Sequence, residues 1–176
     1  LLQEAQPLAA QLQGEPVYWQ VRISRAAHHG DTDRLDRLLA QLLEQFPDQS
    51  WAIELYLWSQ IDRQHSAGLA LLLQEWRPLA RAEGSLWLPF ASAYSLLGNV
   101  QQALYWFRLY VRANPDDQLA LAAYADSLEQ AGQADSAWRL RRYLLAQWRR
   151  NPPDDESLQP ERYVTYLRLL ASVSGV

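Results

Sequence analysis

The residue types that bind metals gather at one point of the sequence, which reads HHGDTD from His28 to Asp33. A metal site needs several such ligands that converge on one ion. Gly30, however, falls at a predicted turn between two helices, and Asp31 and Asp33 stand at the start of the second helix. Carboxylates there cap free N–H groups and favour the positive end of the helix dipole. We therefore predict that this cluster forms a turn and a cap, and that the chain holds no metal.

Paired carboxylates, which could support acid–base catalysis, occur at Asp116-Asp117 and at Asp154-Asp155-Glu156. Such chemistry needs two carboxylates across a cleft with shifted pKa values. Both sets stand just before predicted helices, so capping is their expected role. The sequence has no GxSxG, glycine-rich phosphate loop or HExxH motif, and nothing indicates a nucleophile or a nucleotide site. We predict a non-catalytic chain without a cofactor.

The elements that carry these residues follow a period of about 34 residues, which is typical of a helix-turn-helix repeat array. The clearest unit runs from Gly84 to Asp117, where Gly98 and Asn99 separate two amphipathic segments and Pro115 follows the second. Gly98 suits the left-handed conformation that often ends a helix, and Pro115 cannot continue a helix interior. A turn glycine and a closing proline also occur 68 residues earlier, so a whole unit fits between.

Residues at fixed offsets within this unit indicate how its two helices pack. Small residues allow the helices to approach closely, and large residues on the same stripe fill the space around them. Counted from Gly84 as position 1, the offsets are Trp87 at 4, Ala91 at 8, Tyr94 at 11, Gly98 at 15, Ala103 at 20, Phe107 at 24 and Pro115 at 32. This pattern resembles the tetratricopeptide repeat (TPR) family. The resemblance implies an all-α fold, a right-handed superhelical α-solenoid that acts as a protein-binding scaffold.

The repeat register predicts one solenoid fragment over residues 1–176. Its parts are a partial repeat over 1–13, repeats over 16–49, 50–83, 84–117 and 118–152, and a terminal helix over 160–173.

Three of these parts depart from the clearest unit. The repeat 50–83 is degenerate, since Gln64 replaces the turn glycine. Its helices are expected near 49–63 and 66–82, the second kinked or divided by Pro78. The second helix of the repeat 118–152 should be about a turn longer than its counterparts. In the terminal helix, the residues at helical spacing are Tyr163, Leu167 and Leu170.

Composition limits the classes of partner. The net charge of −4 disfavours nucleic acid, whose recognition relies on basic patches. All sixteen cationic residues are Arg, and there is no Cys, so disulfides and Cys-bound metals are excluded. No apolar run is long enough to span a membrane. Because the sequence also contains no Met, we expect it to be a fragment of a longer protein.

The concave face of the predicted array is the first candidate for partner binding, because solenoids present such faces to their ligands. The positions that line this face in TPR arrays include seven candidate residues: Trp51, Glu54, Trp58, Ser92, Ser95, Asp126 and Glu129. The alternative is the convex face, where second helices carry Arg108, Arg112, Arg139 and Arg142. TPR domains that grip the acidic tail of chaperones use a Lys and an Asn where this chain has Gln20 and Ser24, so that function is disfavoured.

The overall character of the repeats also resembles the TPR segments of bacterial exopolysaccharide-export proteins of the Pel type. The shared features are Trp- and Arg-rich degenerate repeats and the lack of Cys. The resemblance implies a periplasmic, outer-membrane-associated protein of biofilm formation that recruits a polysaccharide deacetylase or hydrolase and assists polymer export. Two alternatives stay open: a cytosolic TPR adaptor that holds a peptide in its groove, and direct binding of carbohydrate by the repeats.

Overall fold

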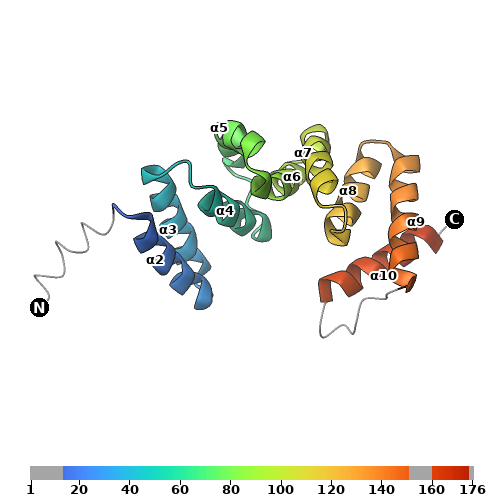
Figure 1. Cartoon of the computed structure of the whole chain (residues 1–176), viewed down its shortest axis with the longest axis horizontal. Helices are drawn as coiled ribbons and strands as arrows, with labels where there is room; N and C mark the ends of the chain where they lie inside the picture. Colours follow the sequence, from blue (N-terminus) through green and yellow to red (C-terminus); the bar gives the residue numbers. More distant parts are fainter. Residues whose placement is uncertain (1–13, 151–159, 175–176) are drawn as a thin grey trace, which may run out of the picture. The chain divides into compact units, whose positions relative to one another are not determined.

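The computed structural model describes residues 14–150 and 160–174, and within those ranges every regular secondary-structure element is a helix (Figure 1). The predicted all-α class is thereby confirmed. The predicted partial repeat over 1–13 and the carboxylates Asp154-Asp155-Glu156 lie outside the described residues. The elements in chain order are α2 (Pro16–His28), α3 (Thr32–Gln45), α4 (Ser50–Asp62), α5 (Leu69–Ala82), the short 3-10 helix η1 (Gly84–Leu86), α6 (Trp87–Leu96), α7 (Val100–Ala113), α8 (Gln118–Gln130), α9 (Ala134–Arg150) and α10 (Pro160–Ser174).

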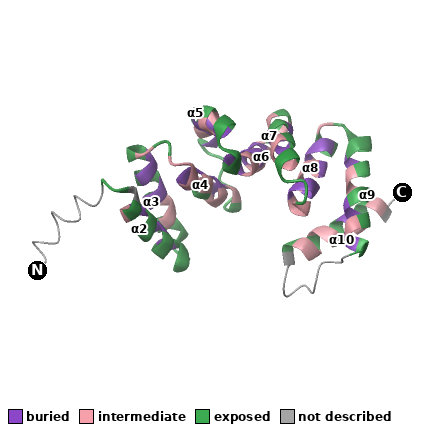
Figure 2. Ribbon diagram, in the orientation of Figure 1, coloured by how far each residue is buried: buried purple, intermediate pink, exposed green. Residues whose placement is uncertain are grey.

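Contacts divide the chain into two compact units, Leu1–Pro89 and Phe90–Val176, with the boundary inside α6. Each unit has buried residues on one side of its helices and exposed residues on the other, as Figure 2 shows, and almost all of the buried residues are apolar.

Four turns that end the first helices of the repeats share one backbone geometry. Gly30, Gln64, Gly98 and Gly132 are spaced 34 residues apart, and their φ angles are 65°, 53°, 69° and 76°. At Gly98, the N–H of the next residue, Asn99, donates to the Tyr94 carbonyl at 2.9 Å, and the Gly98 N–H donates to the Ser95 carbonyl at 3.0 Å. These two bonds define a Schellman motif, and the other three turns repeat them. The predicted left-handed Gly98 is therefore confirmed, and Gln64 adopts the same conformation without being glycine.

Side-chain caps begin α3, α7 and α8. Asp31 Oδ1 accepts the Arg34 N–H at 3.0 Å, Asn99 Oδ1 accepts the Gln102 N–H at 3.3 Å, and Asp117 Oδ1 accepts the Ala120 N–H at 3.0 Å. The capping role predicted for Asp31 and Asp117 is confirmed. Asp33 differs, because its carboxylate lies 2.9 Å from Arg63 Nη2 in an ion pair.

A polar network takes the place of an aromatic residue in the degenerate repeat of unit 1. Gln60, at the offset where the next repeat has Tyr94, is buried. Its Nε2 donates to Asp36 at 3.4 Å, and its Oε1 lies 2.8 Å from His65 Nδ1. Asp36 also accepts bonds from Ser59 and Arg63. A buried amide without such partners would be costly, so the network explains how this repeat tolerates the substitution.

The second helix of this repeat begins later than predicted, and of the two effects predicted for Pro78, a kink or a division, the division does not occur. α5 begins at Leu69 and not near residue 66, because Gly68 directly before it has a positive φ of 74°. Pro78 lies inside α5, which runs on to Ala82, so the proline does not divide the helix.

Trp87 is less buried than its role as a packing residue predicted. It is half-buried, and its indole N–H donates to the Ala80 carbonyl at 2.9 Å. Ala80 stands near the end of α5, where carbonyls lack an intrahelical partner. Trp87 thus provides a hydrogen-bond partner for a carbonyl at the end of α5. Because the ring is only half-buried, replacing Trp87 with Ala should reduce the free energy of unfolding by less than the loss of a fully buried tryptophan would.

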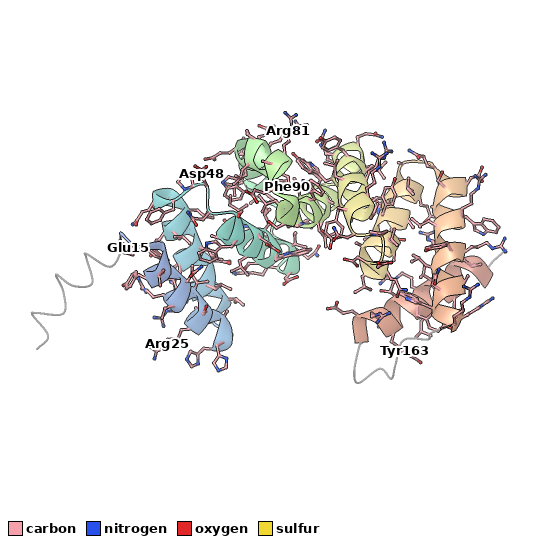
Figure 3. The ribbon with its side chains drawn as sticks, viewed as in Figure 1. Glu15, Arg25, Asp48, Arg81, Phe90 and Tyr163 are labelled. Carbon is pink, nitrogen blue, oxygen red and sulfur yellow. The ribbon has the colours of Figure 1, made fainter. Side chains whose placement is uncertain are left out.

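The core of unit 2 combines large aromatic residues with Leu and Ala. Phe90, labelled in Figure 3, packs edge-on against Trp106 with ring centroids 5.0 Å apart. Ala91 and Ala103, the predicted small residues, are both buried. Trp148 is fully buried and donates its indole N–H to Gln118, which also accepts from Arg162 at 2.7 Å.

The last two helices of unit 2 test two further expectations. α9 has 17 residues against 14 in α3, α5 and α7, as expected for a helix about a turn longer. The predicted apolar stripe of α10 was partly wrong, because Leu167 is 47% exposed. The residues of α10 that pack on the core are Tyr166, Leu169, Leu170 and Val173.

The turn geometry predicts opposite effects for two substitutions. A left-handed conformation costs a non-glycine residue roughly 1–2 kcal/mol, so Gly98→Ala should destabilise the chain by about that amount. No atom lies within 4 Å of a Cβ at Gly98, so the cost is conformational. Gln64→Gly should raise the free energy of unfolding by up to about 1 kcal/mol, since glycine's larger unfolded-state entropy offsets part of the gain. Urea denaturation measures both. Gly84→Ala is the control, because Gly84 lacks a positive φ, and an equal loss in both alanine variants would contradict the prediction.

Two buried tryptophans of unit 2 allow a matched comparison. Trp106 and Trp148 are both fully buried, but the Trp106 indole N–H has no hydrogen-bond partner in the described structure. Both Trp→Phe changes lose the same volume, yet Trp106→Phe also removes a buried donor that costs about 1–3 kcal/mol unpaired. Trp148→Phe should therefore reduce the free energy of unfolding by about 1–2 kcal/mol more than Trp106→Phe. Denaturant titrations in which Trp106→Phe is the costlier change would refute this account.

Candidate partner-binding surfaces

The predicted concave residues of unit 1 form one stripe on α4. Trp51, Glu54 and Trp58 are spaced three and four residues apart, so they share a helix face, and all three are half-buried. The Trp51 indole N–H donates to Gln49 Oε1 at 3.2 Å. Burial raises the pKa of Glu54, and a hydrogen bond from Trp58 partly opposes this rise. The stripe is aromatic, but its polar groups already have partners within unit 1.

The predicted concave residues of unit 2 fall into two groups. Ser92 and Ser95 are half-buried on α6, and the Ser95 hydroxyl donates to the Ala91 carbonyl at 3.0 Å. Asp126 and Glu129 lie on α8 and line a pocket of about 420 Å³ between α8, α9 and α10. The structure therefore brings these two carboxylates together in one pocket, whereas the serines do not line it.

Arg141 is the residue of this pocket that sequence reasoning missed. Its Nη2 lies 2.7 Å from Asp126 Oδ1 and 2.6 Å from Glu129 Oε2, and its side chain is only 11% exposed. The hydrogen bond and charge of Arg141 lower the pKa of Glu129, and that bond in turn raises the pKa of Arg141. The sequence does contain a sign of this role, because Arg141 occupies the repeat offset at which the clearest repeat has the aromatic residue Phe107.

This ion-pair triad changes what the pocket can bind. Both predicted carboxylates are paired with one guanidinium held between them, so the triad offers a ligand one net negative charge in place of two. Arg168 and Thr165 of α10 also line the pocket, but the Thr165 hydroxyl donates to the Glu161 carbonyl at 2.8 Å. Four of the polar residues that line the pocket, Asp126, Glu129, Arg141 and Thr165, thus already have partners within unit 2.

The predicted convex residues lie on two exposed stripes, which we name the Arg stripes. On α7 the stripe contains Tyr105, Arg108 and Arg112, spaced three and four residues apart. On α9 it contains Trp138, Arg139, Arg142, Tyr143, Arg149 and Arg150, all of them exposed. The guanidinium of Arg142 lies 4.7 Å from the centre of the Trp138 ring, a cation–π contact.

The charge on these stripes is one-sided. Six Arg residues of α7 and α9 are exposed, against a single exposed acidic residue, Asp135. The corresponding helices of unit 1, α3 and α5, differ because each exposes both positively and negatively charged residues. Their exposed charged residues are Asp33, Arg34, Arg37 and Glu44 on α3, and Glu75 and Arg81 on α5. Unit 2 thus carries a local positive surface on a chain whose net charge is −4.

Over residues 14–150 and 160–174, no group of three or more His, Asp or Glu side chains could hold a metal ion. In the same ranges, every helix is too short or too polar to cross a bilayer.

Comparison with known proteins agrees with the fold. The profile of the family described as "Tetratricopeptide repeat" matches residues 1–150, which is most of the chain. A search of curated protein sequences gave no match. Among solved structures, the chain is similar to a tetratricopeptide repeat protein from Parabacteroides merdae, with a TM-score of 0.62 and 17% identity. That alignment covers 97% of this chain and 65% of the Parabacteroides chain, so this chain spans less than two thirds of its relative's length.

The 34-residue spacing of the left-handed turns, the helix pairs between them and the family match over residues 1–150 lead to one conclusion: the chain belongs to the tetratricopeptide repeat family.

Proposed function

We propose that this chain is a non-catalytic scaffold that binds an acidic surface of a partner protein through the Arg stripes of α7 and α9. Membership of the TPR family supports a protein-interaction role. The finer assignment of the surface rests on one observation, the six exposed Arg residues of the Arg stripes against one exposed acid. Guanidinium groups form bidentate bonds with carboxylates, which suits them to an acidic partner.

Exposed aromatic residues strengthen the case for these stripes. Trp138 is 40% exposed and Tyr143 is 53% exposed, although both rings are large and apolar. Trp, Tyr and Arg are the residue types most enriched among interface hot spots. On the concave side, by contrast, Asp126 and Glu129 are already paired with Arg141. A partner gains more where charged and aromatic side chains still face solvent.

Charge reversal on α7 tests this proposal. Arg108→Glu with Arg112→Glu should slow association with the partner by about tenfold at low ionic strength, because these charges steer encounter. The effect should shrink as salt is added. Arg34→Glu with Arg37→Glu is the matched control, since this pair is exposed on α3 and changes the net charge equally. Surface plasmon resonance against the recovered partner measures both, after circular dichroism has confirmed folding.

The control also defines the contrary result. If both double variants slow association equally, net charge and not the Arg stripes explains the effect. If neither changes association but Trp58→Ala raises the off-rate with little salt dependence, the partner binds at the concave stripe of α4 instead.

For the identity of the partner, we propose a periplasmic polysaccharide-modifying enzyme, a deacetylase or hydrolase recruited by an exopolysaccharide-export protein. What supports this is the character of the sequence: degenerate repeats rich in Trp and Arg, without Cys. The cytosolic adaptor and direct carbohydrate binding are the alternatives.

Affinity capture separates these alternatives. The chain should enrich such an enzyme from a periplasmic extract of the source bacterium, and the Arg108→Glu/Arg112→Glu variant should enrich it less. Specific capture of cytosolic proteins alone, quantified by mass spectrometry, would instead favour an adaptor in the cytosol.

A further inference from the structure

A second pocket, in unit 1, combines two features that suit a cation. It has a volume of about 260 Å³ and lies between α3, α4 and α5, which follow one another along the chain (Figure 1). Its lining includes Leu43 and Glu44 from α3, Tyr56 from α4, and Leu72, Glu75 and Trp76 from α5. Because sites for drug-sized ligands usually exceed about 300 Å³, this pocket is suited to a single side chain.

The walls of the pocket are aromatic and aliphatic. The rings of Tyr56 and Trp76 meet edge-to-face with centroids 6.0 Å apart, and they connect α4 to α5. Burial, together with the nearby charge of Asp36, raises the pKa of Tyr56, and a tyrosine phenol is neutral at physiological pH even at its ordinary pKa. Such rings attract cations through their electron-rich faces. Leu43 and Leu72 add apolar surface against which an aliphatic stem can pack.

Two carboxylates line the same pocket from separate helices. Glu44 and Glu75 are both exposed, and within the described parts of the chain neither has an ion-pair partner. This distinguishes them from Asp126 and Glu129, which Arg141 compensates. An occupant with a positive charge would therefore meet two negative charges, and it would also have an apolar wall for the rest of its side chain.

We infer that this pocket binds an arginine side chain of a partner protein. Arginine fits better than lysine, because its planar guanidinium stacks on aromatic rings and carries five N–H donors. These donors can serve two carboxylates at once, whereas an ammonium is a compact and strongly hydrated charge. The site lies in unit 1 and uses none of the residues of the Arg stripes, so the inference goes beyond the proposed function and does not depend on it.

The test uses two small probes that differ only in charge. Acetyl-arginine amide and acetyl-citrulline amide have nearly the same shape, but the citrulline side chain is neutral. Each is titrated into the ¹⁵N-labelled chain, and the indole N–H signal of Trp76 and the backbone amides of Glu44 and Glu75 are followed by NMR. Arginine amide should shift these signals saturably, and citrulline amide should bind at least about fivefold more weakly, because it lacks the charge.

Matched variants assign the effect to the two carboxylates. Glu44→Gln combined with Glu75→Gln should weaken binding of arginine amide by about 5- to 20-fold, since an exposed ion pair contributes a factor of roughly two to five. Glu83→Gln should leave the affinity within about twofold, because Glu83 is an exposed glutamate of unit 1 that does not line the pocket. Circular dichroism confirms that each variant is folded.

Three results would overturn the inference. The first is no saturable shift of the Trp76 indole at the highest soluble concentration of arginine amide. The second is equal binding of the citrulline probe, which would mean that charge plays no part. The third is an unchanged affinity in the Glu44→Gln/Glu75→Gln variant. None of these results bears on the Arg108→Glu/Arg112→Glu experiment, so the two proposals fail separately.

Discussion

A single left-handed residue at the end of each first helix is the constraint on which the repeats depend. It reverses the chain within three residues at Gly30, Gly98 and Gly132, so that the second helix folds back along the first. The Schellman bonds satisfy backbone groups that a helix end would otherwise leave unpaired. Only after this reversal can the small and large residues of the two helices meet, because their offsets assume a turn of fixed length.

Most of these turns and helix pairs could be predicted from the sequence, because backbone conformation depends on local residue types. The turns and two of the caps lay where glycine and aspartate indicated them, and the helices near 49–63 and 66–82 are α4 and α5. What escaped prediction depends on contacts between distant residues. Gln60 is tolerated in the core because Asp36, 24 residues away, accepts its amide. The exposure of Leu167 follows from how α10 packs on α9 and α8, which helical spacing alone does not determine.

Prediction of the candidate binding surfaces from the sequence had the same limit. Trp58 and Asp126 were identified from repeat offsets, but an offset says nothing of whether a polar group already has a partner. The guanidinium of Arg141 comes from a position that usually carries an aromatic ring, and it compensates two residues chosen as binding groups. Among the described residues, the six exposed Arg residues of α7 and α9 have no ion-pair partner, and few acidic side chains share their helices. Departures from the family pattern therefore decide which surfaces can still bind.

The loop between α4 and α5 has a consequence for the order of folding. It contains six residues, 63–68, where the other helix pairs are joined by three, and it must place both Gln64 and Gly68 in left-handed conformations. Repeat proteins nucleate in one region and add neighbouring helices in turn. We expect the α8–α9 pair, whose short turn contains Gly132, to form early, and the α4–α5 pair to join late. Pulse-labelled hydrogen exchange would then protect the amides of α9 before those of α5, so the most divergent repeat would also be the last to be completed.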